Sequence, residues 1–159
     1  MILLLHNIRS LHNVGSIFRT ADGAGVEKIY LCGYTPAPVD RWGKYRPQIS
    51  KVALGAEKTI SWEKKNGVAA VVRKLRAEGY KIFAVEQDPR SVPYYSLLPT
   101  RYSLPRVALM FGNEVRGLPP SVLKLADKIL EIPMLGRKES LNVSVSVGVV
   151  VYGLLEKGM

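Results

Sequence analysis

Short apolar runs alternate with longer amphipathic segments along the chain. Residues 2–5 (ILLL) and 28–31 (KIYL) have the length and composition of short β-strands. In the intervening stretch, residues 12–25, apolar side chains recur at helical spacing and glycines follow, which is typical of a helix and its end. These three segments predict a β-α-β unit.

The same alternation continues through the rest of the chain. Residues 66–79 (NGVAAVVRKLRAEG) predict an amphipathic helix with Asn66 at its N-cap and Gly79 just past its end. Further apolar runs predict strands at 81–86, 107–111 and 128–134, and a short helix is predicted at 119–128. Strands that alternate with helices predict an α/β fold, with a mostly parallel sheet covered by helices on both faces.

Residues 140–150 (SLNVSVSVGVV) are compatible with two structures. Leucine and valine alternate strictly with small or polar residues, and this period of two favours a half-buried strand. On a helix, however, Ser140, Ser144 and Gly148 would fall at successive steps of four residues and would allow close backbone approach. The period alone does not decide between the two.

Two proline-rich stretches, residues 33–48 and 87–106, fit neither period. Both interleave Arg or Lys with Trp or Tyr, a mixture that is able to bind phosphates and to stack on bases. The alternative is a pair of ordinary surface loops, which suits the second stretch better than the first.

Composition and charge narrow the class of protein. The chain has 159 residues, 47% of them hydrophobic, which is enough for one compact domain. No apolar run reaches the roughly 20 residues of a membrane span, and the N-terminal MILLLH is too short for a secretory signal. The single cysteine, Cys32, excludes an internal disulfide, and we interpret it as a small apolar residue at a strand end. We therefore expect a soluble cytoplasmic protein.

The charge points to a polyanionic partner. The formal net charge is +10, from 23 Lys and Arg against 13 Asp and Glu. Nucleic acid is the leading candidate, and a solvated basic surface without a partner is the alternative. Because the cations are spread along the chain and do not line one amphipathic helix, we expect no membrane association.

The usual nucleotide-binding signatures are absent from the sequence. No G-x-G-x-x-G follows the first strand, and there is no Walker A sequence. The two histidines, His6 and His12, are too few for a convincing metal site, so we expect no bound metal and assign neither a role. An ordinary Rossmann NAD enzyme or P-loop NTPase is unsupported.

The residues that follow the predicted strands carry the chemistry, since ligands of open parallel sheets bind beyond the carboxyl ends of the strands. Three such segments combine glycine with amide, hydroxyl or charged side chains: NVGSIFR (13–19), FGNEVRGL (111–118) and the stretch that starts IPMLGRKESLN (132–155). In order and spacing they resemble motifs 1, 2 and 3 of the SpoU/TrmH-like branch of the SPOUT RNA methyltransferases.

The resemblance implies a fold and an activity. It implies an α/β domain with a deep C-terminal trefoil knot, S-adenosylmethionine bound within the knot, and a homodimer with active sites at the subunit interface. It also implies that 135–139 (LGRKE) closes the cofactor pocket and that Ser140 caps a final helix reaching about Leu155. This helix would override the valine alternation.

The resemblance also assigns residues to the cofactor. Ile132, Met134 and Leu141 would form an apolar wall around the adenine, although their pattern alone would suit ordinary core residues. At Gly112 a side chain would intrude on the cofactor. Val85 and Glu86 end a neighbouring strand, and we expect them to line the same pocket.

Arg19 matches the catalytic arginine of the family. A guanidinium remains protonated at neutral pH and is a poor proton acceptor, so we assign Arg19 an electrostatic and positional role. It would hold a phosphate and stabilise the developing alkoxide of the ribose. Its orientation would be fixed by the other predicted catalytic residues, Asn13, Glu114, Ser140 and Asn142.

Residues 1–159 are expected to form a single catalytic domain without a separate RNA-binding domain. Contacts with RNA would then come from this domain, and we assign them to Arg9, Arg41, Lys44, Arg46 and Arg116. The reaction is methyl transfer to a ribose 2'-hydroxyl, with tRNA favoured over rRNA. The alternatives are a catalytically inactive RNA-binding protein with the knotted fold, and an α/β enzyme that acts on another nucleotide-containing ligand.

Overall fold

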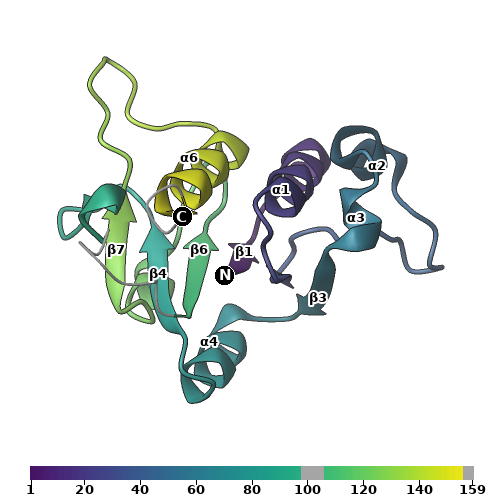
Figure 1. The fold of residues 1–159 in the computed structure, drawn as a ribbon, viewed down its shortest axis with the longest axis horizontal. Coiled ribbons are helices and arrows are strands. Elements are labelled where there is room, and N and C mark those ends of the chain that lie inside the picture. Colours follow the sequence, from purple (N-terminus) through teal and green to yellow (C-terminus); the bar gives the residue numbers. More distant parts are fainter. Residues whose placement is uncertain (98–105, 156–159) are drawn as a thin grey trace.

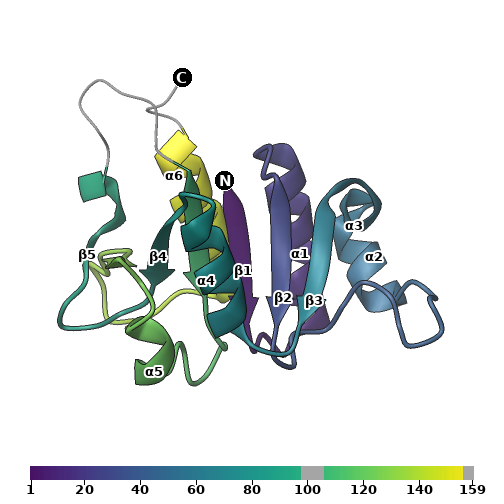
Figure 2. The ribbon, with the colours of Figure 1, turned by 90° about the horizontal axis from the view of Figure 1, so that it is seen from below.

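The protein is built on one parallel β-sheet. The structure is a computed structural model that describes residues 1–97 and 106–155. Seven strands pair in the order β3-β2-β1-β6-β4-β7-β5 (Figure 1 and Figure 2). Their bounds are β1 Ile2–His6, β2 Lys28–Cys32, β3 Ser61–Lys65, β4 Lys81–Val85, β5 Val92–Pro93, β6 Val107–Phe111 and β7 Lys128–Glu131.

Helices cover both faces of the sheet. One face carries α1, α2, α3 and α6, and the other carries α4 and α5 (Figure 2). Among the described residues, no helix is both long and apolar enough to cross a bilayer. The helices are α1 Leu11–Gly23, α2 Pro47–Ala53, α3 Ala56–Thr59, α4 Val68–Ala77, α5 Pro120–Leu123 and α6 Val143–Leu155, and a 3-10 helix, η1, spans Tyr94–Leu97.

The central strands contribute alternately to two apolar cores. In β1, Leu3 and Leu5 pack into the cluster beneath α1 and α6, whereas Leu4 packs into the cluster beneath α4 and α5. All three side chains are fully buried. Continuous apolar runs are expected for strands that are covered on both faces, so the predicted parallel α/β fold is confirmed. The trefoil knot stays a prediction.

The valine-rich segment is a helix. Helix α6 begins at Val143, so the strand suggested by the period of two does not form. The Asn142 side chain accepts a hydrogen bond from the backbone N–H of Ser144 at 2.9 Å. Asn142, directly before the first helical residue, therefore caps the helix, and the predicted cap at Ser140 is wrong, because Ser140 lies two residues further from the helix.

Packing explains why the helix prevails over the alternation. Val143, Val147, Val150, Val151 and Leu154 form one buried stripe of α6 at helical spacing. The helix packs against α1, where a Cβ added to Gly148 would lie 4.0 Å from the Thr20 methyl carbon. Tertiary contacts thus override the β-propensity of valine.

Other boundaries differ from the predictions in detail. Helix α4 has Gly67 at its N-cap, not Asn66, whereas Gly79 has a positive φ of 83° just past the helix end, as predicted. The irregular stretch predicted at 33–48 ends where α2 begins, at Pro47. In the stretch predicted at 87–106, β5 and η1 form, and residues 98–105 lie outside the described residues.

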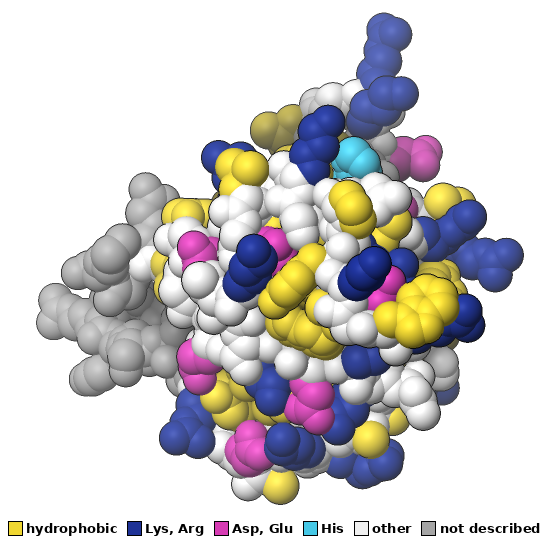
Figure 3. All heavy atoms as spheres, turned by 90° about the vertical axis from the view of Figure 1, so that its right-hand side faces the viewer, with side chains coloured by type: hydrophobic (Ala, Val, Ile, Leu, Met, Phe, Trp, Pro, Cys, Tyr) yellow, Lys and Arg dark blue, Asp and Glu magenta, His cyan; other side chains and the backbone are white. Residues whose placement is uncertain are grey.

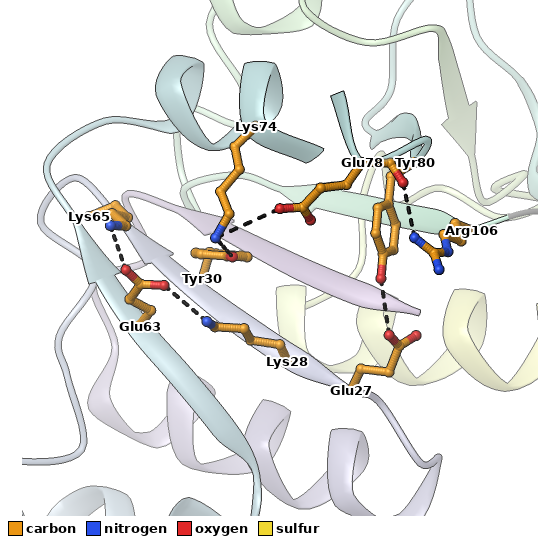
Figure 4. A network of polar contacts seen from close by, with 9 residues as sticks. All are labelled: Glu27, Lys28, Tyr30, Glu63, Lys65, Lys74, Glu78, Tyr80 and Arg106. Carbon is orange, nitrogen blue, oxygen red and sulfur yellow. Dashed lines mark hydrogen bonds and ion pairs between the residues drawn. The ribbon is translucent and has the colours of Figure 1, made fainter. Parts of the chain in front are cut away.

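Strand β3 was not predicted, because its sequence, SWEKK, is mostly polar. It forms one edge of the sheet, and Glu63 binds Lys65 and, at 3.0 Å, Lys28 of β2 (Figure 4). Hydrogen bonds from Lys65 and Lys28 lower the pKa of Glu63 to about 2. Charged side chains are a common protection of an exposed strand edge against further pairing.

Cys32 ends β2 and is buried, as predicted. Burial raises the pKa of its thiol to about 12, so the thiol remains protonated at neutral pH. The side chain therefore acts as a small apolar residue of the core.

Candidate active site

A pocket lies at the carboxyl ends of the central strands. It is bounded by the loop 112–117, which follows β6, and by the segment 132–141, which follows β7. All six predicted cofactor residues line it, together with the predicted catalytic residues Glu114 and Ser140. Its lining is Val85, Glu86, Gln87, Phe111, Gly112, Asn113, Glu114, Val115, Gly117, Ile132, Met134, Ser140, Leu141, Val143 and Ser146.

The apolar wall of this pocket is not ordinary core. Ile132 and Met134 are only half-buried, and Leu141 remains 40% exposed. Core side chains of this size are normally fully buried, as the leucines of β1 are. The exposure favours the assignment of these residues to a ligand pocket.

Gly112 is required by the packing of its own loop. A Cβ added there would lie 2.5 Å from the carbonyl carbon of Gly117 and 2.6 Å from the backbone nitrogen of Leu118. These are backbone atoms that cannot move aside easily. Glycine is therefore required at position 112 because two parts of the chain approach closely there. This reason adds to the predicted approach of a cofactor.

Glu86 fastens the same loop from the end of β4. Its carboxylate accepts the backbone N–H of Leu118 at 2.8 Å and that of Gln87 at 3.0 Å. Gly117 adopts a φ of +61°, and a Cβ there would overlap the Glu86 Oε2 atom. Glu86 thus shapes the pocket wall.

Glu114 joins the loop after β6 to the start of α1. Its carboxylate accepts the backbone N–H groups of Arg9 and Ser10, each at 3.0 Å, and the Asn13 side-chain amide at 3.0 Å. Burial raises the pKa of Glu114, but backbone hydrogen bonds, first those from Ser10 and Arg9, and the side-chain hydrogen bond from Asn13 together outweigh it, so the net effect is a lowered pKa. The carboxylate is therefore a structural anion that holds the start of α1.

The Asn13 side chain continues this network to α6. Its Oδ1 atom accepts a hydrogen bond from the Asn142 side-chain amide at 3.2 Å. The structure thus brings Asn13, Glu114 and Asn142 together, and Ser140 lies on the rim of the same pocket.

Arg19 does not join this group within one chain. It lies on α1, its side chain is exposed, and it does not line the pocket. The pocket lining includes two carboxylates, from Glu86 and Glu114, but no Lys or Arg from residues 1–97 or 106–155. Among the described residues, therefore, no cation lines this pocket itself.

A second cleft adjoins the first and is basic. Asn113 and Val115 line both cavities. Three of the predicted RNA-binding residues, Arg9, Arg46 and Arg116, lie in the second cleft, and none of the described residues that line it carries a carboxylate. The cleft is lined by Arg9, Leu11, Gly33, Tyr34, Thr35, Pro36, Ala37, Arg46, Lys64, Asn113, Val115 and Arg116.

Arg41 and Lys44 lie outside this cleft. Arg41 stacks over Trp42, with its guanidinium carbon 4.0 Å from the ring centroid, and Trp42 is 72% exposed. Lys and Arg side chains are spread over the face of the molecule that carries α2 and α3 (Figure 3). Contacts of Arg41 and Lys44 with RNA stay predictions.

Sequence reasoning missed Asn113, Lys64 and Tyr34. Asn113 is 7% exposed, and its side-chain amide donates to the Asn7 carbonyl and to the Tyr34 hydroxyl, each at 2.9 Å. Its place in the FGNEVRGL motif could have indicated a role. Lys64 lies on the unpredicted strand β3, and no sequence signal pointed to it.

Metal ligands do not cluster in the part of the chain that the structure describes. Residues 1–97 and 106–155 contain no group of three or more His, Cys, Asp or Glu side chains placed to hold a metal ion.

The parallel sheet, covered by helices and with a pocket at its carboxyl edge, defines an α/β domain. A profile of the SpoU rRNA Methylase family matches residues 1–152, and the chain belongs to this family. It is 33% identical over 151 residues to the 23S rRNA (guanosine-2'-O-)-methyltransferase RlmB of Neisseria meningitidis serogroup B, covering 95% of this chain and 56% of that protein.

A second relative is the tRNA (guanosine(18)-2'-O)-methyltransferase of Aquifex aeolicus. It is 32% identical over 163 residues, which cover all of this chain and 72% of the relative. The chain thus spans little more than half of the Neisseria protein and about three quarters of the Aquifex protein.

Solved structures show the same fold. An AdoMet-bound rRNA methyltransferase from Sinorhizobium meliloti has a TM-score of 0.85 and 29% identity, with 98% of this chain and 55% of that chain covered. A structure that concerns the 2-OH methylation of C/U34 on tRNA has a TM-score of 0.76 and 28% identity. The alignment with this second structure covers 98% of this chain and 94% of that chain.

Proposed function

We propose that the protein is an S-adenosylmethionine-dependent RNA methyltransferase that acts on a ribose 2'-hydroxyl. The observation that carries the proposal is the pocket at the carboxyl edge, which gathers all six residues expected to hold the cofactor. Membership of the SpoU family and the methyltransferase names of the relatives support the same reaction. The adjoining basic cleft supports RNA as the substrate.

The pocket suits the chemistry of this cofactor. Ile132, Met134 and Leu141 offer an apolar surface to an adenine ring, and they are not buried by the protein itself. The carboxylate of Glu86 and the backbone of the loop 112–117 supply polar groups to the same pocket. When bound, S-adenosylmethionine supplies an activated methyl group on a sulfonium centre.

The residues of this chain would position the ribose and stabilise charge. Glu114 holds the first turn of α1, and the Asn13 and Asn142 amides extend this network to the start of α6. Such preorganised donors accelerate a reaction by fixing geometry before charge develops. Arg19 would hold a phosphate of the RNA and stabilise the negative charge on the ribose oxygen as its proton leaves.

A homodimer is supported by the place of Arg19. The described lining of the pocket has no Lys or Arg, and Arg19 is exposed on α1 outside this lining, so the predicted catalytic arginine lies apart from the other site residues of its own chain. We propose that a second copy supplies it. Light scattering should report a dimer at micromolar concentration, and a fully active monomer would contradict this proposal.

We favour tRNA as the substrate. The Aquifex relative is named for tRNA, and the solved structure of which this alignment covers 94% concerns methylation of tRNA. The Neisseria relative is named for 23S rRNA, and rRNA is therefore the comparison substrate.

The test is incubation with S-adenosylmethionine and either undermodified tRNA or rRNA fragments, followed by nucleoside mass spectrometry. A 2'-O-methylated nucleoside from tRNA is expected. Absence of methylation from both RNAs, with tight RNA binding, would favour an inactive RNA-binding protein. The remaining alternative is an α/β enzyme that acts on another nucleotide-containing ligand. Calorimetry with S-adenosylhomocysteine, NAD and ATP tests it, since only S-adenosylhomocysteine should bind.

Replacement of the arginine tests the mechanism. Arg19→Lys keeps the positive charge but loses the planar guanidinium, whose forked N–H donors can bind two oxygens at once. Methyl transfer should therefore fall on the order of 10²–10³-fold, while S-adenosylhomocysteine binds as before. Single-turnover assays at saturating RNA measure the fall. Arg73→Lys is the matched control, because Arg73 is an exposed arginine of α4 on the opposite face of the sheet. Near-parental turnover of Arg19→Lys would contradict the role of the fork.

A further inference from the structure

Tyr34 presents an exposed aromatic ring on a firmly bonded backbone. It follows β2, and its side chain is 57% exposed in the basic cleft. Its backbone N–H donates to the Asn7 Oδ1 atom at 3.1 Å, and its hydroxyl accepts the Asn113 amide at 2.9 Å. Both ends of the residue are therefore fixed while the ring remains accessible.

The residues on either side of Tyr34 are held as firmly. The Lys64 ammonium donates to the carbonyl of Gly33 and, at 2.6 Å, to that of Thr35. The Thr35 hydroxyl, fully buried, donates to the Leu5 carbonyl at 2.8 Å and accepts the Ile8 N–H at 3.0 Å. An exposed ring on such a support loses little conformational freedom when a ligand stacks on it.

The surroundings of the ring suit a nucleotide. Leu11, Pro36 and Ala37 add apolar surface to the cleft. Arg46 lines the same cleft. Its guanidinium is suited to a phosphate oxygen, and no described residue of the cleft offers a carboxylate that would compete for it.

We propose that Tyr34 and Arg46 form a nucleotide subsite in the basic cleft, in which a base of single-stranded RNA stacks on the Tyr34 ring and its phosphate binds Arg46. The subsite rests on the proposed function for its ligand, RNA. Because Asn113 lines both cavities and donates to Tyr34, a nucleotide held here lies beside the candidate active site. The subsite would thus place one nucleotide of the substrate relative to the reacting ribose.

Stacking on Tyr34 can be measured without catalysis. The probe is a single-stranded oligoribonucleotide that carries 2-aminopurine, whose fluorescence is quenched on stacking. Tyr34→Ala should abolish the quenching and weaken binding on the order of 10-fold, because base-aromatic stacking contributes this much per base. Tyr34→Trp should restore both signals. The matched control is Tyr95→Ala, because Tyr95 is 51% exposed on η1, beside β5 at the far edge of the sheet.

Steady-state kinetics connects the subsite to the reaction. For Tyr34→Ala the KM for tRNA should rise about 10-fold, with unchanged affinity for S-adenosylhomocysteine. Arg46→Ala should weaken RNA binding and reduce the slope of log K against log salt by about 1, whereas Arg73→Ala should not change it. Tyr34→Phe tests the bond to Asn113, because it keeps the ring and loses the hydroxyl.

The outcomes separate the subsite from the proposed function. Parental quenching and KM in the folded Tyr34→Ala variant would overturn the subsite and leave methyl transfer by the parent protein intact. Quenching that depends on Tyr34 in a protein that methylates no RNA would overturn the proposed function and support the subsite. If Tyr34→Ala does not fold, failure of Tyr34→Trp to quench the probe would overturn the subsite.

Discussion

The turn at residues 33–35 and the segment at residues 135–141 both lie beyond a strand at the carboxyl edge of the sheet, but they are held very differently. The turn is fixed by side chains from three strands or strand ends, those of Asn7, Lys64 and Thr35 itself. The segment makes no hydrogen bond to any residue in the described ranges 1–97 and 106–155. Leu135 is 99% exposed.

This difference separates two kinds of ligand site. The cleft around the turn is complete in the free protein, because the polar groups of the turn are already paired. The pocket wall formed by the segment can make further contacts with a ligand, since Leu141 lines the cavity and remains 40% exposed. We expect a ligand in the pocket to order the segment and to leave the turn unchanged.

The largest effect is expected from a methyl group placed in the turn. Gly33→Ala would make a Cβ overlap the Asn7 Oδ1 atom, at a residue with φ of +64°. Strain and overlap together should lower the free energy of unfolding by about 2–4 kcal/mol. Urea denaturation measures the loss.

Gly136→Ala is the matched control in the other segment. No described atom lies within 4 Å of a Cβ added there, and its φ is not positive. Its free energy of unfolding should change by less than about 0.5 kcal/mol. Equal effects of the two substitutions would contradict the difference between the segments.

A smaller loss is expected when the buried hydroxyl of the turn is removed. Thr35→Val keeps the shape but leaves the Ile8 N–H without its acceptor, which should cost about 1–3 kcal/mol of unfolding free energy. Thr59→Val removes an exposed hydroxyl and should cost less than about 0.5 kcal/mol. Thermal and urea unfolding measure both losses, and a loss for Thr59→Val as large as that for Thr35→Val would contradict the role of the buried hydroxyl.

The end of the unbonded segment is marked by the helix cap. Asn142→Ala removes the acceptor for the Ser144 N–H at the start of α6 and should cost about 1 kcal/mol. Ser140→Ala should leave the unfolding free energy unchanged within about 0.5 kcal/mol. Urea denaturation measures both changes. A larger loss for Ser140→Ala than for Asn142→Ala would indicate that Ser140 caps the helix.

The smallest effect is expected in the acid limb of the stability curve. Since the pKa of Glu114 is lowered in the folded protein from its ordinary value of 4.5, its contribution is fully present above that value and is lost as pH falls through the lowered pKa. Glu114→Gln should therefore flatten the loss of stability below about pH 4.5. Glu139→Gln, in the unbonded segment, is the control, and an equally flattened curve would contradict the assignment to Glu114.

The sequence was sufficient for the parallel strands of the core, and the six residues expected to hold the cofactor line one pocket. Apolar runs such as 107–111 are buried on both faces, and the pattern of a continuous run survives in the sequence. Strand β3 was not predicted, because an edge strand buries little apolar surface and its sequence lacks an apolar pattern. The helix at 143–155 was predicted only through the family resemblance, because its packing on α1 is not encoded in the alternation of valine.

The motifs do not predict that the residues of the basic cleft lie together. Arg9 and Arg116 lie within or beside the motifs, whereas Tyr34 and Arg46 come from the proline-rich stretch 33–48 and Lys64 comes from strand β3. Their proximity depends on the order of strands in the sheet and on side-chain hydrogen bonds to backbone carbonyls. Neither can be read from the spacing of residues along the chain.

The position of β1 in the middle of the sheet has a consequence for folding during synthesis. One of its edges pairs with β2, but the other pairs with β6, where Ile2 meets Ala108 and Leu5 meets Phe111. About a hundred residues must therefore leave the ribosome before this edge can be closed. Until then, the apolar side chains of β1 lack half of their partners, and pairing of such distant strands is slow. The nascent N-terminal half thus presents an unpaired apolar strand edge, which favours aggregation.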